Sequence, residues 1–255
     1  MMLDVDRPQS QLLIFETADA LYQVAEAYVR QRAAVAVEER GRFLLVLSGG
    51  STPLPLYRRL AKPRVEKPFP WSQTHLFWGD ERMVPPTDPE SNFGQAESSL
   101  LTHVPVPTTQ VYRIPGEQDP VTASETYAET LRQAAAATGK AWPRFDLVLL
   151  GLGSDGHTAS LFPGSAFPPP VGQPTQAVLA QYGDRPAGRV TLTSPVFNSA
   201  RHLVFLVTGA GKAEALAHVL AGPPDPVRWP AQRIQPENGT LVWFVEEKAA
   251  HLLQH

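Results

Sequence analysis

The segment Gly151-Leu-Gly-Ser-Asp-Gly-His-Thr-Ala-Ser-Leu-Phe-Pro-Gly164 holds the residues of this chain that are best suited to chemistry. Asp155 and His157 stand two positions apart in it, among glycines. A histidine with its ordinary pKa of about 6.5 can take or give a proton near neutral pH, and a neighbouring carboxylate can orient it. The pattern predicts a general acid–base site in which His157 is the working group. The alternative is a turn whose histidine is only structural.

The position of this segment strengthens the prediction. It follows Phe145-Asp-Leu-Val-Leu-Leu150, a short apolar run that is typical of a buried strand in a parallel sheet. Ligands of open α/β sheets bind at the carboxyl ends of the strands. We therefore expect His157 at the edge of the sheet where such a fold does its chemistry.

A second glycine-rich segment, Ser48-Gly-Gly-Ser-Thr-Pro53, also follows an apolar run and precedes a helical pattern. The N-terminus of a helix favours anions through its dipole and its unpaired N–H groups. The segment lacks the lysine of a nucleotide-binding P-loop and the third glycine of a dinucleotide fingerprint. We expect Ser48, Gly49, Gly50 and Ser51 to bind a small anion, with an ordinary helix cap as the alternative.

Two further strand exits carry fixed positive charge, Arg82 in Gly79-Asp-Glu-Arg82 and Lys212 in Gly209-Ala-Gly-Lys212. A phosphate monoester, nearly doubly charged at neutral pH, needs such partners. Either cation alone would more often be a solvated surface charge. Four polar exits after apolar strands, however, suggest one shared cleft.

Asp80 and Glu81 are adjacent, so on an extended chain their side chains point to opposite sides. We expect Asp80 to face the cleft and Glu81 to have a structural or capping role. The histidines His218, His251 and His255 show no spacing that indicates a metal site.

Strand-like and helix-like segments alternate along the chain. This alternation predicts a doubly wound, mostly parallel sheet with helices on both faces. We expect strands at Leu12–Phe15, Arg42–Leu47, His75–Trp78, Gln110–Ile114, from Phe145, at Val190–Thr193, His202–Thr208 and Gly239–Val245. We expect helices after Thr17, after Pro53, at Ser91–Leu101, from Asp119 to Gly139, at Pro195–Ala200, Ala213–Ala221 and Glu246–Leu253. The Pro- and Gly-rich stretch from Phe167 to Gly188 is expected to be an exposed excursion.

The composition excludes several classes of protein. The 255 residues contain no cysteine, which excludes disulfides and thiolate chemistry and suits a reducing cytoplasm. The formal net charge of −3, with no basic block, argues against a nucleic-acid partner. No run of residues is apolar enough to span a membrane, and the first residues lack the pattern of a signal peptide. We expect one domain over residues 1–255, located in the cytoplasm, with no obligate protein partner evident.

Four blocks together resemble the 6-phosphogluconolactonases of the glucosamine-6-phosphate isomerase/6-phosphogluconolactonase family, over residues 12 to 250. They are Leu47-Ser-Gly-Gly-Ser-Thr-Pro53, Trp78-Gly-Asp-Glu-Arg-Met-Val-Pro85, Asp88-Pro-Glu-Ser-Asn-Phe93 and the segment from Gly151 to Pro163. The resemblance implies the Rossmann-like fold of the glucosamine-6-phosphate deaminase group. It also implies hydrolysis of 6-phospho-D-glucono-1,5-lactone, the second step of the oxidative pentose phosphate pathway.

One position separates the two activities of this family. The deaminases resemble Asp-Gly-His-Ile-Ala-Phe-Asn-Glu, with a glutamate five positions after the histidine, whereas this chain has Phe162 there. Phenylalanine cannot transfer a proton, so the departure favours the lactonase over a deaminase or isomerase. A non-enzymatic sugar-phosphate sensor is a further alternative, although this chain shows no basic patch.

The resemblance also implies roles for single residues. His157 would activate water as the general base, and Asp80 and Asp155 would orient or tune the site. Arg82 and Lys212, with the Ser48–Ser51 loop, would hold the 6-phosphate, and Asn92 would contact sugar hydroxyls. The expected partner is the phosphorylated sugar lactone alone, and neither a cofactor nor a metal is implied.

Overall fold

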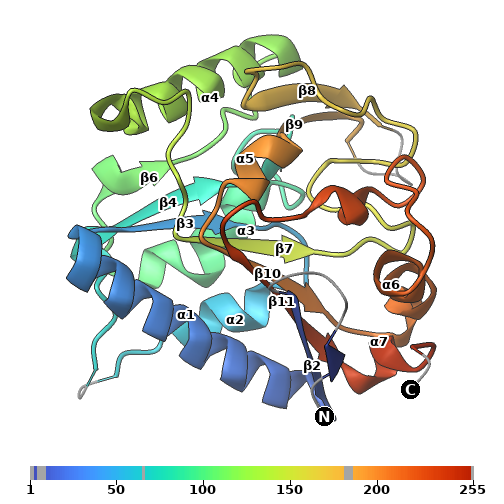
Figure 1. Ribbon diagram of the computed structural model, residues 1–255. Coiled ribbons are helices and arrows are strands. Elements are labelled where there is room, and N and C mark those ends of the chain that lie inside the picture. Colours follow the sequence, from blue (N-terminus) through green and yellow to red (C-terminus); the bar gives the residue numbers. More distant parts are fainter. Residues whose placement is uncertain (1–2, 5–9, 65–66, 181–185, 254–255) are drawn as a thin grey trace.

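The chain folds around one large, mostly parallel sheet (Figure 1). The structure is a computed structural model that describes residues 3–4, 10–64, 67–180 and 186–253. In spatial order the strands are β1 (Leu3–Asp4), β2 (Ser10–Phe15), β11 (Thr240–Glu246), β10 (His202–Val207), β7 (Leu147–Gly151), β3 (Phe43–Leu47), β4 (Thr74–Trp78) and β6 (Val111–Tyr112). All are parallel except β1, which pairs antiparallel with β2 at the edge.

The strand order reverses between β3 and β7, which lie side by side. From β3 the chain builds outward through β4 to β6, and from β7 it builds the other way through β10 and β11. A reversal of this kind leaves a crevice at the carboxyl ends of the two strands, where ligands of doubly wound folds bind. The four polar exits of the sequence follow β10, β7, β3 and β4, which are consecutive in the sheet.

Helices cover both faces of the sheet, as predicted (Figure 1). The α-helices are α1 (Ala18–Arg40), α2 (Leu54–Ala61), α3 (Asn92–Ser99), α4 (Pro120–Ala134), α5 (Ser194–Asn198), α6 (Ala213–Leu220) and α7 (Glu247–Ala250). Short 3-10 turns lie at Trp71–Gln73, Leu101–His103, Thr108–Gln110, Ala136–Thr138, Ala210–Lys212 and Pro230–Arg233. The Thr17 hydroxyl caps α1 by accepting a hydrogen bond from the Ala20 N–H at 3.2 Å.

A second, antiparallel sheet corrects two expectations. It consists of β5 (Asp80–Arg82), β9 (Gly188–Leu192) and β8 (Thr175–Leu179), in that order. The exit at Gly79–Arg82 is therefore a short strand, and the stretch from Phe167 to Gly188 holds β8 beside its exposed parts; its residues 181–185 lie outside the described chain. β9 is the central strand and pairs with β5 on one side and β8 on the other. This pairing supplies the backbone hydrogen bonds that neither β5 nor β8 can make locally.

Nearly all of the buried apolar residues of the described chain form one cluster that runs from Leu12 to Leu253. It includes Val190 and Leu192 of β9, so the small sheet shares the core of the large one. Among the described helices, none combines the length and the apolar character needed to cross a membrane.

Candidate active site

The four polar exits line one cleft of about 170 Å³ at the carboxyl edge of the sheet. Of the residues predicted for the site, the cleft brings together Ser48, Gly49, Gly50, Ser51, Arg82, His157 and Lys212. Thr52, Gly151, Leu152, Gly153 and Ala159 complete its lining. Asp80, Asn92 and Asp155 do not line the cleft in this structure.

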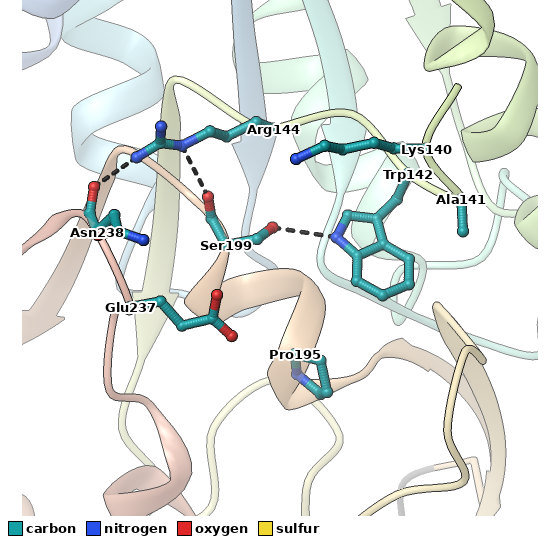
Figure 2. A pocket seen from close by; sticks show the side chains of 8 residues that line it. All are labelled: Lys140, Ala141, Trp142, Arg144, Pro195, Ser199, Glu237 and Asn238. Carbon is teal, nitrogen blue, oxygen red and sulfur yellow. Dashed lines mark hydrogen bonds between the residues drawn. The ribbon is translucent and has the colours of Figure 1, made fainter. Parts of the chain in front are cut away.

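A larger hollow of about 390 Å³ lies at the opposite edge, before the first residues of β7, β10 and β11 (Figure 2). Its floor is held by Trp142 and Arg144, which both donate hydrogen bonds to Ser199, from Nε1 and Nε at 3.1 Å. None of the predicted site residues lies there. The smaller cleft is therefore the better candidate, because chemistry rather than size distinguishes the two.

His157 is held in a tight turn by its own loop. Its Nδ1 lies 2.6 Å from Oδ1 of Asp155, which also accepts the His157 backbone N–H at 3.1 Å. The Gly153 N–H donates to the His157 carbonyl at 2.8 Å, and a Cβ at Gly153 would lie 2.1 Å from Nδ1. A side chain at position 153 would thus displace the imidazole, which explains the glycine.

Burial raises the pKa of the Asp155 carboxyl, but the hydrogen bond and the charge of His157 outweigh it, so the pKa lies below its usual value. An ionised Asp155 favours a proton on Nδ1 of His157, which makes Nε2 the basic nitrogen. On its other side the imidazole packs against Phe162, with ring centroids 4.8 Å apart. Asp155 and Phe162 together orient His157.

The glycine-rich loop after β3 is anchored by Tyr57 of α2. The Tyr57 hydroxyl donates to the Ser48 carbonyl at 2.7 Å and accepts the Ser48 N–H at 2.9 Å. Gly50 has a φ of +84°, which favours glycine, and a Cβ at Gly49 would lie 1.8 Å from Oδ1 of Asn92. Both glycines are therefore required by the shape of the loop.

Arg82 is not the solvated charge that a lone arginine usually is. It is 5% exposed, and its guanidinium donates to the Glu90 carbonyl at 2.6 Å and pairs with the Glu90 carboxylate at 3.3 Å. Lys212 reaches the same cleft from the turn before α6. Two cations from different strand exits thus meet beside the glycine loop.

The structure places Asp80 differently from our expectation. Its buried carboxylate lies behind the cleft wall, where it accepts hydrogen bonds from Ser160 at 2.6 Å and from Asn92 at 3.2 Å. Asn92 also donates to the Asp80 carbonyl at 2.9 Å. These contacts join β5 to the start of α3 and to the loop after β7, and Asn92 also packs against Gly49 of the loop after β3, so Asp80 and Asn92 connect the walls of the cleft. The carboxylate on His157 is Asp155.

Glu81 caps α3, as expected. Its carboxylate accepts the backbone N–H groups of Arg82, Asn92 and Phe93 at 2.7–2.8 Å. It is 2% exposed, and this burial raises its pKa to about 7 despite the three hydrogen bonds. Among the described residues, no group of three or more His, Cys, Asp or Glu side chains is placed to hold a metal ion.

Comparison with known proteins decides the family. The family described as glucosamine-6-phosphate isomerases/6-phosphogluconolactonase matches residues 16–243. The chain belongs to this family. It is 38% identical to a 6-phosphogluconolactonase of Synechocystis over 97% of this chain and 99% of the relative. It is 41% identical to the 6-phosphogluconolactonase of Rattus norvegicus, over 94% of this chain and 92% of the relative.

Solved structures of the family share the fold. The 6-phosphogluconolactonase of Thermotoga maritima superposes with a TM-score of 0.78 at 29% identity, over 93% of this chain and all of the other. This agreement supports the doubly wound architecture.

The sequence did not point to Ser160, Glu90 or Trp229, which contact Asp80, Arg82 and Gly156 respectively. Ser160 lies inside the histidine block and Glu90 inside the block from Asp88 to Phe93, but no local signal marks Trp229.

Proposed function

We propose that this chain hydrolyses 6-phospho-D-glucono-1,5-lactone to 6-phosphogluconate. The observation that carries the proposal is the cleft, which joins an Asp155-oriented His157 to two cations and an anion-binding loop. Membership of the family and the names of its relatives support the same reaction.

The phosphate end of the substrate would lie between Arg82, Lys212 and the Ser48–Ser51 loop. Charge-assisted hydrogen bonds from two cations and loop N–H groups suit a dianion. Binding at this end would place the lactone carbonyl near His157. Attack by water then becomes effectively intramolecular, which lowers the entropic part of the barrier.

His157 would act as the general base. Its Nε2 takes a proton from water as the water oxygen bonds to C1, and a tetrahedral oxyanion forms. When the bond from C1 to the ring oxygen breaks, the same nitrogen returns the proton to that oxygen. The products are the carboxylate of 6-phosphogluconate and its new hydroxyl, with one proton released. Acid–base catalysis of this kind contributes roughly 10²–10⁴-fold.

The oxyanion needs hydrogen-bond donors in the cleft. Gly151 and Leu152 line the cleft with His157, and their backbone N–H groups are the candidate source, because the Gly153 N–H already donates to the His157 carbonyl. Asp80 would act indirectly, since its carboxylate accepts hydrogen bonds from Ser160 and Asn92 rather than from the His157 imidazole.

Deaminase chemistry is not favoured by the site. Phe162, whose ring packs on His157, replaces the acid that the deaminase-like motif carries. A solved monomeric glucosamine-6-phosphate deaminase has a TM-score of 0.79 at 21% identity, which shows a common fold alone. Release of ammonia from glucosamine 6-phosphate would reverse this assignment.

The test is the rate at which 6-phosphogluconolactone disappears at near-neutral pH, with and without protein. The lactone also hydrolyses unaided, so the rate without protein is subtracted. We expect a large acceleration that is absent with unphosphorylated gluconolactone. No acceleration would overturn the proposal, whereas binding of 6-phosphogluconate without turnover would favour a sensor. The cytoplasmic location stays a prediction, which cell fractionation tests.

A further inference from the structure

A segment far from the site in sequence lies against the loop that carries His157. Residues 225–231, called the strap here, hold this loop at two points. The Ala231 N–H donates to the Gly156 carbonyl at 2.9 Å, and the Gly164 N–H donates to the Val227 carbonyl at 3.0 Å. The strap therefore holds the loop on both sides of His157 through main-chain bonds.

The side chain of Trp229, in the strap, packs against the loop. A Cβ at Gly156 would lie 2.5 Å from Cε3 of Trp229, so the indole fills the space where a side chain would be. Gly156 has a φ of +81° and is the residue directly before His157. A shift of the indole thus acts on the backbone that sets the position of the imidazole.

The same indole also contacts α6. Trp229 stacks on His218 with ring centroids 4.3 Å apart and planes 12° from parallel. Gln232, just after the strap, donates to the His218 carbonyl at 3.0 Å. Helix α6 begins directly after Lys212, so Trp229 lies between the element that carries His157 and the element that carries Lys212.

We propose that Trp229 is a positioning residue, which sets the placement of His157 relative to Lys212. The inference rests on the proposed function, in which Lys212 holds the phosphate and His157 acts at the other end of the substrate. A rigid substrate held at one end is misaligned at the other when the two elements move apart. A misplacement of about 1 Å can cost about 10²-fold in rate, although the substrate still binds.

The variants Trp229→Ala, Trp229→Phe and His218→Ala test this role. We expect Trp229→Ala to lower kcat about 10- to 100-fold. Calorimetric titration with 6-phosphogluconate should still show one site per chain and a Kd within about threefold of the wild type, because the phosphate-binding groups are untouched. Trp229→Phe keeps a ring against His218 and should recover most of kcat. His218→Ala removes the other half of the stack without changing the strap, and should lower kcat about 3- to 10-fold.

Trp142→Ala is the matched control, since Trp142 is another partly buried tryptophan, at the opposite edge of the sheet (Figure 2). It should leave kcat within twofold. A kcat of Trp229→Ala within twofold of the wild type would overturn the inference. So would a loss of binding sites in proportion to the loss of kcat, which indicates a fold-only role. If Trp229→Ala does not fold, unchanged turnover in His218→Ala overturns it. A wild type without lactonase activity would instead overturn the proposed function.

Discussion

At the scale of single residues, the proposed acid–base chemistry depends on the contact between His157 and Asp155. The Asp155 carboxylate lies 2.6 Å from Nδ1 of His157, and His157 lines the cleft. The pair resembles the histidine and carboxylate of a catalytic triad, and in the proposed reaction water is the nucleophile. Because Asp155 contacts Nδ1, proton transfer in the proposed reaction takes place at Nε2 of His157.

Replacing His157 by alanine tests that assignment. We expect His157→Ala to lower kcat by roughly 10²–10⁴-fold, because the general base is lost. Binding of 6-phosphogluconate should survive, since the cations of the cleft remain. Steady-state kinetics and calorimetric titration of the same sample measure the two effects. An unchanged kcat would exclude His157 as the base.

Arg82 is expected to act on binding. Arg82→Ala should raise KM about 10- to 100-fold with a smaller change in kcat, because a lost charge-assisted hydrogen bond costs about 1.5–3 kcal/mol. Arg132→Ala removes an exposed arginine from α4 and serves as the control. A fall in kcat alone would instead assign Arg82 to the chemistry.

The sequence could predict the cleft residues whose placement follows from the strand ends. His157, Arg82 and Lys212 each stand a few residues beyond the end of an apolar strand, and such exits converge in a parallel sheet. The direction of Asp80 could not be predicted in this way. It depends on the pairing of β5 with β9, where Asp80 lies opposite Thr191, more than a hundred positions away. Trp229 comes from a connection without local pattern.

At the scale of elements, the buried Glu81 carboxyl that caps α3 makes the free energy of unfolding depend on pH. The pKa of Glu81 is about 7 in the folded chain and has its ordinary value of about 4.5 when unfolded. Between these values the folded state binds a proton that the unfolded state has lost. The stabilisation that protonated Glu81 gives the folded state is therefore complete below about pH 4.5 and is lost as the pH rises through about 7.

Glu81→Gln should remove this dependence on pH. We expect the free energy of unfolding of the wild type to fall by about 2–3 kcal/mol more than that of the variant between pH 5 and pH 7.5. The loss of the cap adds a cost that does not depend on pH. Urea unfolding at the two pH values measures the difference. Glu97→Gln, at an exposed position of α3, is the control, and equal slopes for Glu81→Gln and the wild type would contradict the prediction.

Some helices and strands have a hydrophobic pattern in their own sequence that predicts them, and others do not. The strands β3, β7, β10 and β11 are apolar runs buried on both faces, so they could be predicted closely. Strand β8 could not, because most of its residues are only partly buried and Leu179 is 82% exposed. Its strand conformation comes from pairing with β9.

At the scale of the whole molecule, the two sheets share one core. Leu192 of β9 is fully buried in the same cluster as the strands of the large sheet. A shared core transmits the loss of either sheet to the other, so we expect the two sheets to unfold together, as the prediction of a single domain over residues 1–255 requires. The cleft also depends on this union, because β5 of the small sheet carries Arg82.

Calorimetry of the wild type and of Leu192→Ala tests this union. We expect one unfolding transition, with the calorimetric enthalpy equal to the van't Hoff enthalpy. Deleting the buried side chain should cost about 2–5 kcal/mol and move the whole transition down by on the order of 10 °C. Added 6-phosphogluconate should raise the same transition, since a ligand at 100 times its Kd stabilises by about 2.7 kcal/mol. If Leu192→Ala split off a separate early transition, the small sheet would be a unit of its own. Arg82 would then be held by a part that can melt independently of His157.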